Sequence, residues 1–303
     1  MKIIYIGSDG PLSCAPLKAL LRYTERDSFE NEFRISAIVS DCFNSTHERV
    51  GHIPVIDYRS NSLESLAFQH NISLFKIQKS LSDVIPAIES CQADIIIVSC
   101  FAYKLPDSVL NIPRIGCFNI HPSLLPAFRG PSPLFWQFRA EKCDFGVSLH
   151  RMTSKFDNGN IIAQKPIIIP DGSNSLQAIE LLAHASAETL LQALPGFIQG
   201  AFKETPQDET QASYQSFPLD DDFIVTTEWN ARRMFNFICV NEAPGLLFIC
   251  EVSGQSFYIS RALSYQKTAY SGFKACRDKP GIKNNQLVLA CSSGFIHCEL
   301  AQL

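Results

Sequence analysis

The chain has 303 residues, of which 46% are hydrophobic and 18% are charged, and this composition excludes the disordered, collagen-like and coiled-coil classes. Its 26 Lys and Arg stand against 30 Asp and Glu, a net charge of −4, so no basic surface covers the whole molecule and a nucleic acid would have to be bound locally. At about 100 to 200 residues per domain, the length predicts two domains.

The cysteine content predicts reduced thiols rather than a disulfide framework. The chain holds 11 cysteines, an odd number, and Met1 leads directly into the apolar run Lys2-Ile3-Ile4-Tyr5-Ile6 in place of a signal peptide. We therefore expect a cytoplasmic protein. The longest apolar runs fall short of the roughly 18 residues that a membrane helix needs, so we expect no membrane partner.

The first two thirds of the chain alternate short β-branched runs with amphipathic helical stretches. Strands are expected at residues 3–6, 35–40, 95–99, 117–120 and 147–150. Helices are expected at residues 16–23, 63–70, 81–90, 133–139 and 176–194. The run Asp94-Ile95-Ile96-Ile97-Val98 has no polar alternation, which indicates a central strand buried on both faces. Together these elements predict the α/β class, with a mostly parallel, Rossmann-like sheet.

A polar segment divides the chain into two predicted domains. Residues 203–216 hold few apolar side chains, so we place a linker at residues 203–218 between a first domain, residues 1–202, and a second domain, residues 219–303. In the second domain a helix is expected at 228–238, and strands are expected at 246–251, 256–259, 287–291 and 295–300. Short strands with glycines at the turns predict a small OB-like β-barrel.

The segment Gly116 to Pro126 carries the clearest functional signal. An apolar strand ends in Asn119-Ile120-His121, and the two-residue period of a strand places the side chains of Asn119 and His121 on the same side. Pro122 prevents the strand from continuing, and the prolines after it predict an extended, rigid loop. An amide and an imidazole are thus fixed at the carboxyl end of a parallel strand, where open α/β sheets bind their ligands.

A carboxylate follows the next expected strand. Asp157 precedes Asn158-Gly159, a turn signal that holds the carboxylate in a fixed loop facing the end of the sheet. Taken singly, each residue also has a structural explanation. A histidine at a strand end is commonly satisfied by its neighbours, and an aspartate in such a turn commonly caps the backbone.

These segments together resemble the formyltransferase superfamily that uses 10-formyltetrahydrofolate. The family motif is Asn-x-His, then Pro-Ser-Leu-Leu-Pro and Arg-Gly, then Asp-x-Gly further along the chain. In this sequence the matching positions are Asn119, His121, residues 122–126, Arg129-Gly130, and Asp157 with Gly159. The resemblance covers residues 1 to about 200, so it implies the formyltransferase fold for a catalytic domain at residues 1–202. The order of helix and barrel in the last hundred residues resembles the methionyl-tRNA formyltransferases.

The resemblance implies that a formyl group passes from 10-formyltetrahydrofolate to a primary amine. Asn119 would donate its N–H to the oxygen that becomes negative in the tetrahedral intermediate. His121, kept cationic by Asp157, would support that oxygen and supply a proton to the leaving folate nitrogen. Asp157 would also take the proton of the amine. No metal is implied, and the remaining histidines show no ligand spacing.

The resemblance also implies a folate pocket between the loops at residues 101–106 and 152–157. The expected contacts from these loops are Phe101, Tyr103, Leu105, Pro106, Met152 and Phe156. The first loop reads Cys-Phe-Ala-Tyr-Lys-Leu-Pro where methionyl-tRNA formyltransferases have Ala-Tyr-Gly-x-x-Leu-Pro. The Leu-Pro anchor is therefore present, while the contacts to the pterin differ.

The distribution of charge bears on the acceptor. Family members that act on tRNA carry a basic, glycine-rich insertion after the second strand, whereas residues 41–57 contain one arginine and two histidines beside three acidic residues. From residue 205 onward eight Lys or Arg stand against ten Asp or Glu, a net of −2. Because tRNA affinity depends on basic side chains, we expect a small amine or an amino sugar as acceptor, with methionyl-tRNA as an alternative.

Two further hypotheses belong to other functional classes. A hydrolase would pass the formyl group to water, and a catalytically inactive paralogue would only bind folate. The presence of Asn119, His121 and Asp157 argues against the inactive paralogue, because a binding protein does not need an oxyanion donor. These motifs encode neither the identity of the acceptor nor the oligomeric state.

Overall fold

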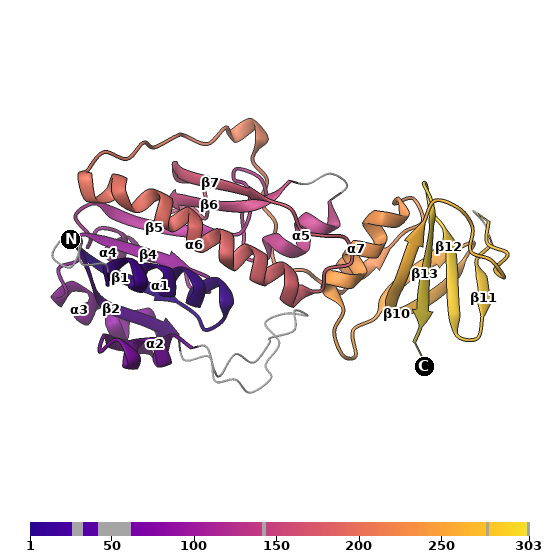
Figure 1. The fold of residues 1–303 in the computed structure, drawn as a ribbon, viewed down its shortest axis with the longest axis horizontal. Coiled ribbons are helices and arrows are strands. Elements are labelled where there is room, and N and C mark those ends of the chain that lie inside the picture. The colour runs from indigo at the N-terminus through magenta and orange to yellow at the C-terminus, as the bar shows by residue number, and fades with distance from the viewer. Residues whose placement is uncertain (26–32, 42–61, 141–143, 277–278, 302–303) are drawn as a thin grey trace.

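The computed structural model describes residues 1–25, 33–41, 62–140, 144–276 and 279–301. Seven strands in these ranges form a first sheet in the order β3-β2-β1-β4-β5-β6-β7 (Figure 1). They are β1 (Lys2–Gly7), β2 (Arg34–Asp41), β3 (Ser73–Ile77), β4 (Ile95–Ser99), β5 (Gly116–His121), β6 (Phe145–Arg151) and β7 (Ile161–Ile167). The strands from β3 to β5 pair in parallel, so the predicted α/β class with a mostly parallel sheet is confirmed.

The strand predicted at 147–150 does not join the parallel set. The longer strand β6 runs antiparallel to β5, and β7 runs antiparallel to β6. The helix before it, α5 (Pro133–Arg139), has seven residues and is about 10 Å long, whereas the six-residue strand β5 is about 20 Å long. Because α5 is too short to carry the chain back along the sheet, β6 begins near the carboxyl end of β5 and returns beside it.

Helices cover both faces of the first sheet. They are α1 (Pro11–Thr24), α2 (Leu63–Gln69), α3 (Ile85–Ser90), α4 (Asp107–Leu110) and α6 (Ser175–Gln199), with a 3-10 turn at Leu81–Val84. Ile95 and Ile97 of β4 pack in the cluster that contains α1 and α6, while Ile96 and Val98 pack in the cluster that contains α3 and α4. The apolar run at 94–98 is therefore a central strand buried on both faces, as its pattern predicts.

A second sheet lies in the last third of the chain. Its order is β11-β12-β13-β10-β9-β8, and it is antiparallel apart from the β8–β9 pair. The strands are β8 (Ile224–Val225), β9 (Phe248–Val252), β10 (Gln255–Gln266), β11 (Gly281–Lys283), β12 (Gln286–Ala290) and β13 (Phe295–Leu300). Among the described strands β8 and β11 are the two edges of this sheet, so the predicted OB-like closure is not confirmed.

The helix predicted at 228–238 is α7 (Ala231–Asn241), and it joins the two sheets (Figure 1). It starts later than predicted because the side chain of Asn230 accepts the Arg233 N–H and caps the helix. Phe135 of α5 packs against Phe237 of α7 with ring centres 5.3 Å apart. One hydrophobic core therefore runs from α5 into the second sheet.

The segment predicted as a linker, residues 203–218, connects α6 to the second sheet and returns along the first one (Figure 1). Thr205 pairs with Ile161 of β7 through two backbone hydrogen bonds of 2.8 and 2.9 Å. Tyr214 pairs with Arg129 in the loop after β5. Many of the polar groups in this segment are hydrogen-bond partners of the first domain, so its composition reflects docking as well as solvation.

Candidate active site

Strand β5 places two of the predicted residues on one face of the sheet. Phe118 and Ile120 pack toward α6, whereas Cys117 packs in the core on the opposite face. The alternation of side chains therefore puts Asn119 and His121 on the face away from α6. His121 is only 4% exposed.

The loop after β6 brings a carboxylate to these two side chains. Asp157 has a backbone φ of 51°, in the left-handed region. Its Oδ1 lies 3.5 Å from Asn119 Nδ2 and 3.7 Å from His121 Nδ1. Its Oδ2 accepts the Gly130 N–H at 2.9 Å. The structure therefore brings Asn119, His121 and Asp157 together at one site.

A second histidine, which the sequence analysis treated only as part of a strand, completes this cluster. His150 of β6 is paired directly with Asn119 of β5 in the antiparallel register. Its Nε2 lies 3.2 Å from Asn119 Nδ2 and 3.5 Å from Asp157 Oδ1. Its Nδ1 lies 2.9 Å from the Arg151 carbonyl oxygen, which only accepts, so this nitrogen is the donor. In the neutral ring Nε2 then accepts a hydrogen bond from Asn119 and orients its amide.

The loop after β5 turns back to hold His121. The predicted extended loop is wrong here, because the Ser123 hydroxyl bonds the Ala127 carbonyl at 2.7 Å and closes a turn. The Phe128 carbonyl oxygen then lies 2.8 Å from His121 Nε2. Since a carbonyl only accepts, Nε2 carries the proton in this contact, and in the neutral ring Nδ1 presents a lone pair toward Asp157.

Burial decides the protonation of His121. Removal from water lowers the pKa of His121, and the nearby His150 lowers it further. Asp157 and the Phe128 carbonyl raise this pKa, but they offset burial only in part. The expectation that Asp157 keeps His121 cationic is therefore corrected, because desolvation outweighs the carboxylate and leaves the imidazole neutral at pH 7.

Asp157 is ionised at neutral pH. Burial alone would raise the pKa of its carboxyl, but in the acid range where this carboxyl titrates the protonated imidazoles of His121 and His150, together with the Gly130 N–H, outweigh burial and bring the pKa below its usual range. The site therefore combines a carboxylate, an amide and a neutral imidazole with a free nitrogen lone pair. This combination can take up a proton and stabilise a developing oxyanion.

The two loops predicted to bind folate lie beside each other. Lys104 Nζ lies 5.6 Å from the centre of the Phe156 ring, which links the loop after β4 to the loop before Asp157. Phe156 lines a hollow of about 480 Å³ together with Lys104, Arg129, Ser154, Lys155, Asn158, Glu209 and Tyr214. This hollow adjoins the Asp157 loop, and of the six predicted folate contacts Phe156 is the one that lines it.

The predicted folate contacts differ in exposure. Tyr103 is exposed, with its ring 5.4 Å from that of Phe101, and Pro106 is exposed at the start of α4. Leu105 is only 1% exposed and packs in the core, and Phe101 and Met152 pack partly against the same cluster. Leu105 therefore anchors the loop in the core.

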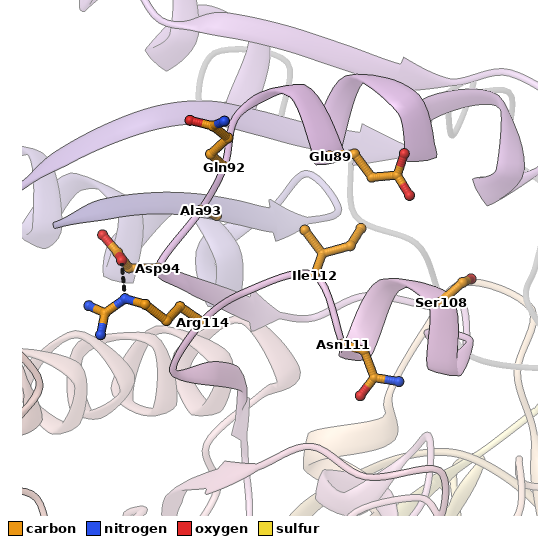
Figure 2. A pocket seen from close by; sticks show the side chains of 8 residues that line it. All are labelled: Glu89, Gln92, Ala93, Asp94, Ser108, Asn111, Ile112 and Arg114. Carbon is orange, nitrogen blue, oxygen red and sulfur yellow. Dashed lines mark hydrogen bonds and ion pairs between the residues drawn. The ribbon is translucent and has the colours of Figure 1, made fainter.

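A larger hollow of about 640 Å³ lies elsewhere on the first sheet. Figure 2 shows that it is bordered by Asp94 and Arg114, just before β4 and β5, where the Arg114 Nε donates to Asp94 at 2.8 Å. This is the amino end of the strands, whereas ligands of open α/β sheets bind at the carboxyl end. We therefore assign no function to this hollow.

Comparison with known proteins places the chain in a family. The model of the family described as formyl transferase matches residues 1–194. The chain belongs to this family.

The methionyl-tRNA formyltransferase of Staphylococcus aureus strain JH1 is 30% identical over 177 residues, which cover 58% of this chain and 57% of the relative. That of Blochmanniella pennsylvanica strain BPEN is 37% identical over 154 residues, which cover 50% and 48%. The chain thus spans about half the length of these curated relatives in the match.

Two solved formyltransferase structures share the fold over nearly the whole chain. One is an N-formyltransferase from Helicobacter canadensis in complex with folinic acid and dTDP-3-aminofucose, with a TM-score of 0.68, 15% identity and 99% of both chains covered. The other is the sugar 3N-formyl transferase WlaRD with dTDP and 5-N-formyl-THF, with a TM-score of 0.66, 16% identity and coverage of 100% and 98%. At these identities the likeness shows the fold alone.

Asn119, His121, His150 and Asp157 all lie inside the part of the chain that matches the formyl transferase family. Residues 205–215, which lie against the loop of Arg129, fall outside it. Within the described ranges, no helix combines the length and the apolarity that crossing a membrane requires. In the same ranges, no three His, Cys, Asp or Glu side chains gather closely enough to hold a metal ion.

Proposed function

We propose that this protein transfers the formyl group of 10-formyltetrahydrofolate to a primary amine. The observation that carries the proposal is the convergence of Asn119, His121 and Asp157, with contacts of 3.5 and 3.7 Å to one carboxylate oxygen, in a member of the formyl transferase family. Related solved structures are complexes with folates, among them folinic acid, 5-N-formyl-THF and, for HypX of Aquifex aeolicus, tetrahydrofolic acid. We assign the hollow beside Phe156 to the folate.

The protonation states suggest the order of the steps. The nitrogen of the acceptor attacks the formyl carbon, and the carbonyl electrons move to oxygen, where the Asn119 N–H stabilises the negative charge. His121 Nδ1 takes the proton that the amine loses, and Asp157 stabilises the imidazolium that results. The electrons on the oxygen then re-form the carbonyl as the carbon–nitrogen bond to the folate breaks, and His121 returns this proton to the leaving nitrogen. His121 is thus first the base and then the acid.

We infer that the acceptor is a small amine, with an amino sugar as the leading class. The net charge of −2 from residue 205 onward supports this inference, because it opposes binding of a polyanion. The fold of sugar N-formyltransferases extends over 99% or more of this chain, which is consistent with it. Methionyl-tRNA is the second candidate, favoured by the 30% and 37% identities to methionyl-tRNA formyltransferases.

We also propose that residues 1–202 form the catalytic domain, that residues 203–218 connect it to an OB-like domain at residues 219–303, and that the protein works in the cytoplasm. Two hydrophobic clusters lie on the two faces of the first sheet, and a third is centred on the second sheet and extends to α5, which supports the division. The nine cysteines within the described ranges are all free thiols, which supports a reducing compartment.

One assay tests the proposed function. Purified protein is incubated with 10-formyltetrahydrofolate and an amino sugar nucleotide, charged initiator tRNA or no acceptor, and tetrahydrofolate release is followed. We expect release that depends on the amino sugar. Release without an acceptor would identify a hydrolase, release with tRNA alone would identify the translation enzyme, and folate binding without release under any condition would indicate a paralogue that only binds.

A further inference from the structure

The segment at residues 205–215, which we call the crossing segment, touches the loops of both His121 and Asp157. It pairs with β7 at Thr205 and with the loop after β5 at Tyr214. Between these two points it contributes one side chain, that of Gln207, to the backbone of the Asp157 loop. This segment lies outside residues 1–194, so the match to the family does not account for it.

Gln207 uses both ends of its side-chain amide. Its Nε2 donates to the carbonyl oxygens of Asp157 at 2.8 Å and Gly159 at 2.7 Å. Its Oε1 accepts from Arg129 Nη2 at 2.7 Å and Nε at 3.1 Å. Because the carbonyls only accept and the guanidinium only donates, one orientation of the amide satisfies all four contacts. The Glu209 carboxylate also accepts from Arg129, from Nη2 at 2.8 Å and from Nη1 at 3.0 Å.

The loop that Gln207 holds needs support. Asp157 is a non-glycine residue with φ of 51°, a backbone conformation that is costly for most side chains. At Gly159 an added Cβ would lie 1.9 Å from the Arg151 carbonyl oxygen, so the chain passes very close to the end of β6. Gln207 satisfies the carbonyls on either side of this tight turn. Without it, both carbonyls would lose their donor and the turn would be free to relax.

The same segment supports the other side of the site. The Ser213 hydroxyl accepts the Phe128 N–H at 2.8 Å, and the Ser213 carbonyl accepts the Arg129 N–H at 2.9 Å. The Phe128 carbonyl in turn holds His121 Nε2 at 2.8 Å. The crossing segment is therefore a common support for the imidazole and the carboxylate, and Gln207 is the part that fixes the carboxylate.

We propose that Gln207 is a positioning residue for formyl transfer, which sets the distance between the Asp157 carboxylate and His121 by holding the backbone of Asp157. This inference rests on the proposed function and extends it to a segment outside the matched family region. Within the described residues, the hydrogen bonds of the Gln207 side chain go to the backbone of Asp157 and Gly159 and to Arg129, so it acts through Asp157 rather than on the substrate.

Kinetics give the first test. Gln207→Met keeps the approximate volume without hydrogen bonds, Gln207→Glu keeps the acceptor for Arg129 without the donors, and Gln211→Glu repeats the charge change at an exposed position of the same segment. We expect kcat to fall by about 10²-fold in both Gln207 variants, as for misplacement of a reacting group by about 1 Å, with a smaller change in KM. Gln211→Glu should match the wild type. Wild-type kcat in a folded Gln207→Met protein would overturn the proposal.

Titration of His121 by NMR in the free protein gives a readout that needs no activity. The groups facing this imidazole are Asp157, His150 and the Phe128 carbonyl, and of these Asp157 raises its pKa most. Displacement of Asp157 should therefore lower the pKa of His121 in Gln207→Met, and Asp157→Asn should lower it as well.

The two tests separate the two proposals. A wild-type protein that lacks formyl transfer, together with the shift in Gln207→Met, would refute the proposed function while retaining the positioning by Gln207. An unchanged pKa of His121 in both Gln207 variants would refute the positioning, whatever the activity of the wild type.

Discussion

A buried carboxylate and a buried imidazole face each other at 3.7 Å in this protein, and each has a pKa below its usual range for a different reason. For Asp157, which titrates in acid, two protonated imidazoles and a backbone N–H outweigh the cost of burial. For His121, burial outweighs the carboxylate. The negative charge therefore stays on Asp157 at neutral pH, while His121 keeps a lone pair at Nδ1 that can accept a proton.

The first prediction concerns the three side chains of the site. His121→Ala and Asp157→Ala should lower kcat by roughly 10² to 10⁴, as expected for loss of proton transfer and its partner. Asn119→Ala should cost about 10² to 10³, as for loss of an oxyanion donor. Circular dichroism and single-turnover kinetics check that the folded variants lose chemistry. Wild-type turnover in all three would remove the catalytic assignment.

The pH dependence follows from the neutral state of His121. A base must be unprotonated, and burial lowers the pKa of His121 below the usual value of about 6.5, so the working form persists to lower pH. We expect the acid limb of kcat/KM for the folate, at saturating acceptor, to have its midpoint below the usual imidazole value of about 6.5. A midpoint above about 6.5 would contradict the lowered pKa of His121.

His150 is the residue that the sequence analysis missed, and it has its own test. Removing its Nε2 leaves the Asn119 amide without the partner at 3.2 Å that orients it. We expect His150→Phe to lower kcat by about tenfold, the equivalent of one hydrogen bond worth roughly 1.4 kcal/mol. His184→Phe is the matched control, because His184 is exposed on α6. Equal kcat in the two variants would exclude a role for His150.

At the scale of elements, the short helix α5 has two consequences. It leaves β6 to run antiparallel to β5, and this register sets His150 opposite Asn119. It also turns aromatic side chains toward the second sheet, where Phe135 meets Phe223, just before β8, and Phe237 of α7, with ring centres 5.2 and 5.3 Å apart. The element that shapes one side of the site thus also attaches the second sheet.

The packing of α5 on α7 gives a prediction on stability. Phe135 is 4% exposed, so Phe135→Ala should lower the free energy of unfolding by about 3 to 5 kcal/mol. Phe68 on α2 is 88% exposed, and Phe68→Ala should change the free energy of unfolding by less than about 0.5 kcal/mol. Urea denaturation measures both variants. Similar values for the two would mean that α5 and α7 do not form a common core in solution.

At the scale of the whole molecule, charge separates the two candidate acceptors. A tRNA-binding surface needs a continuous set of basic side chains leading away from the site. Near the site, Arg129 is paired with Glu209 and Arg151 is paired with Glu204, so neither guanidinium is free for a phosphate. The sequence also contains the acidic run Asp220-Asp221-Asp222 at the entry to the second sheet.

We therefore predict weak or no binding of charged initiator tRNA. Filter binding at about 50 and 200 mM salt tests this, because affinity that rests on several phosphate contacts falls steeply over this range. A folate-dependent product with an amino sugar, measured in parallel, is the positive control for active protein. Tight, salt-sensitive tRNA binding together with formylation of its methionyl group would establish the other acceptor.

Local patterns in the sequence were sufficient for much of the fold. The continuous apolar run of β4 identified a strand buried on both faces, and the two-residue period of β5 placed Asn119 and His121 on one side. The amphipathic pattern at 176–194 identified α6, whose start is closed by a capping box of Asn174 and Gln177. Strands β3 and β7 escaped detection because they lie at the edges of the sheet, where side chains are only partly buried and the apolar pattern is weak.

The sequence alone thus determined the α/β class, the central strand and the identity of the amide, imidazole and carboxylate, because side-chain periodicity and turn residues are local properties. Only the tertiary structure decided the direction of β6, the place of His150 beside Asn119 and the contact of Gln207 with Asp157, which is 50 residues away in the chain. It also decided the charge of His121. Strand direction depends on the length of a connection, hydrogen bonds join distant segments, and protonation follows from burial, and none of these is encoded in a local pattern.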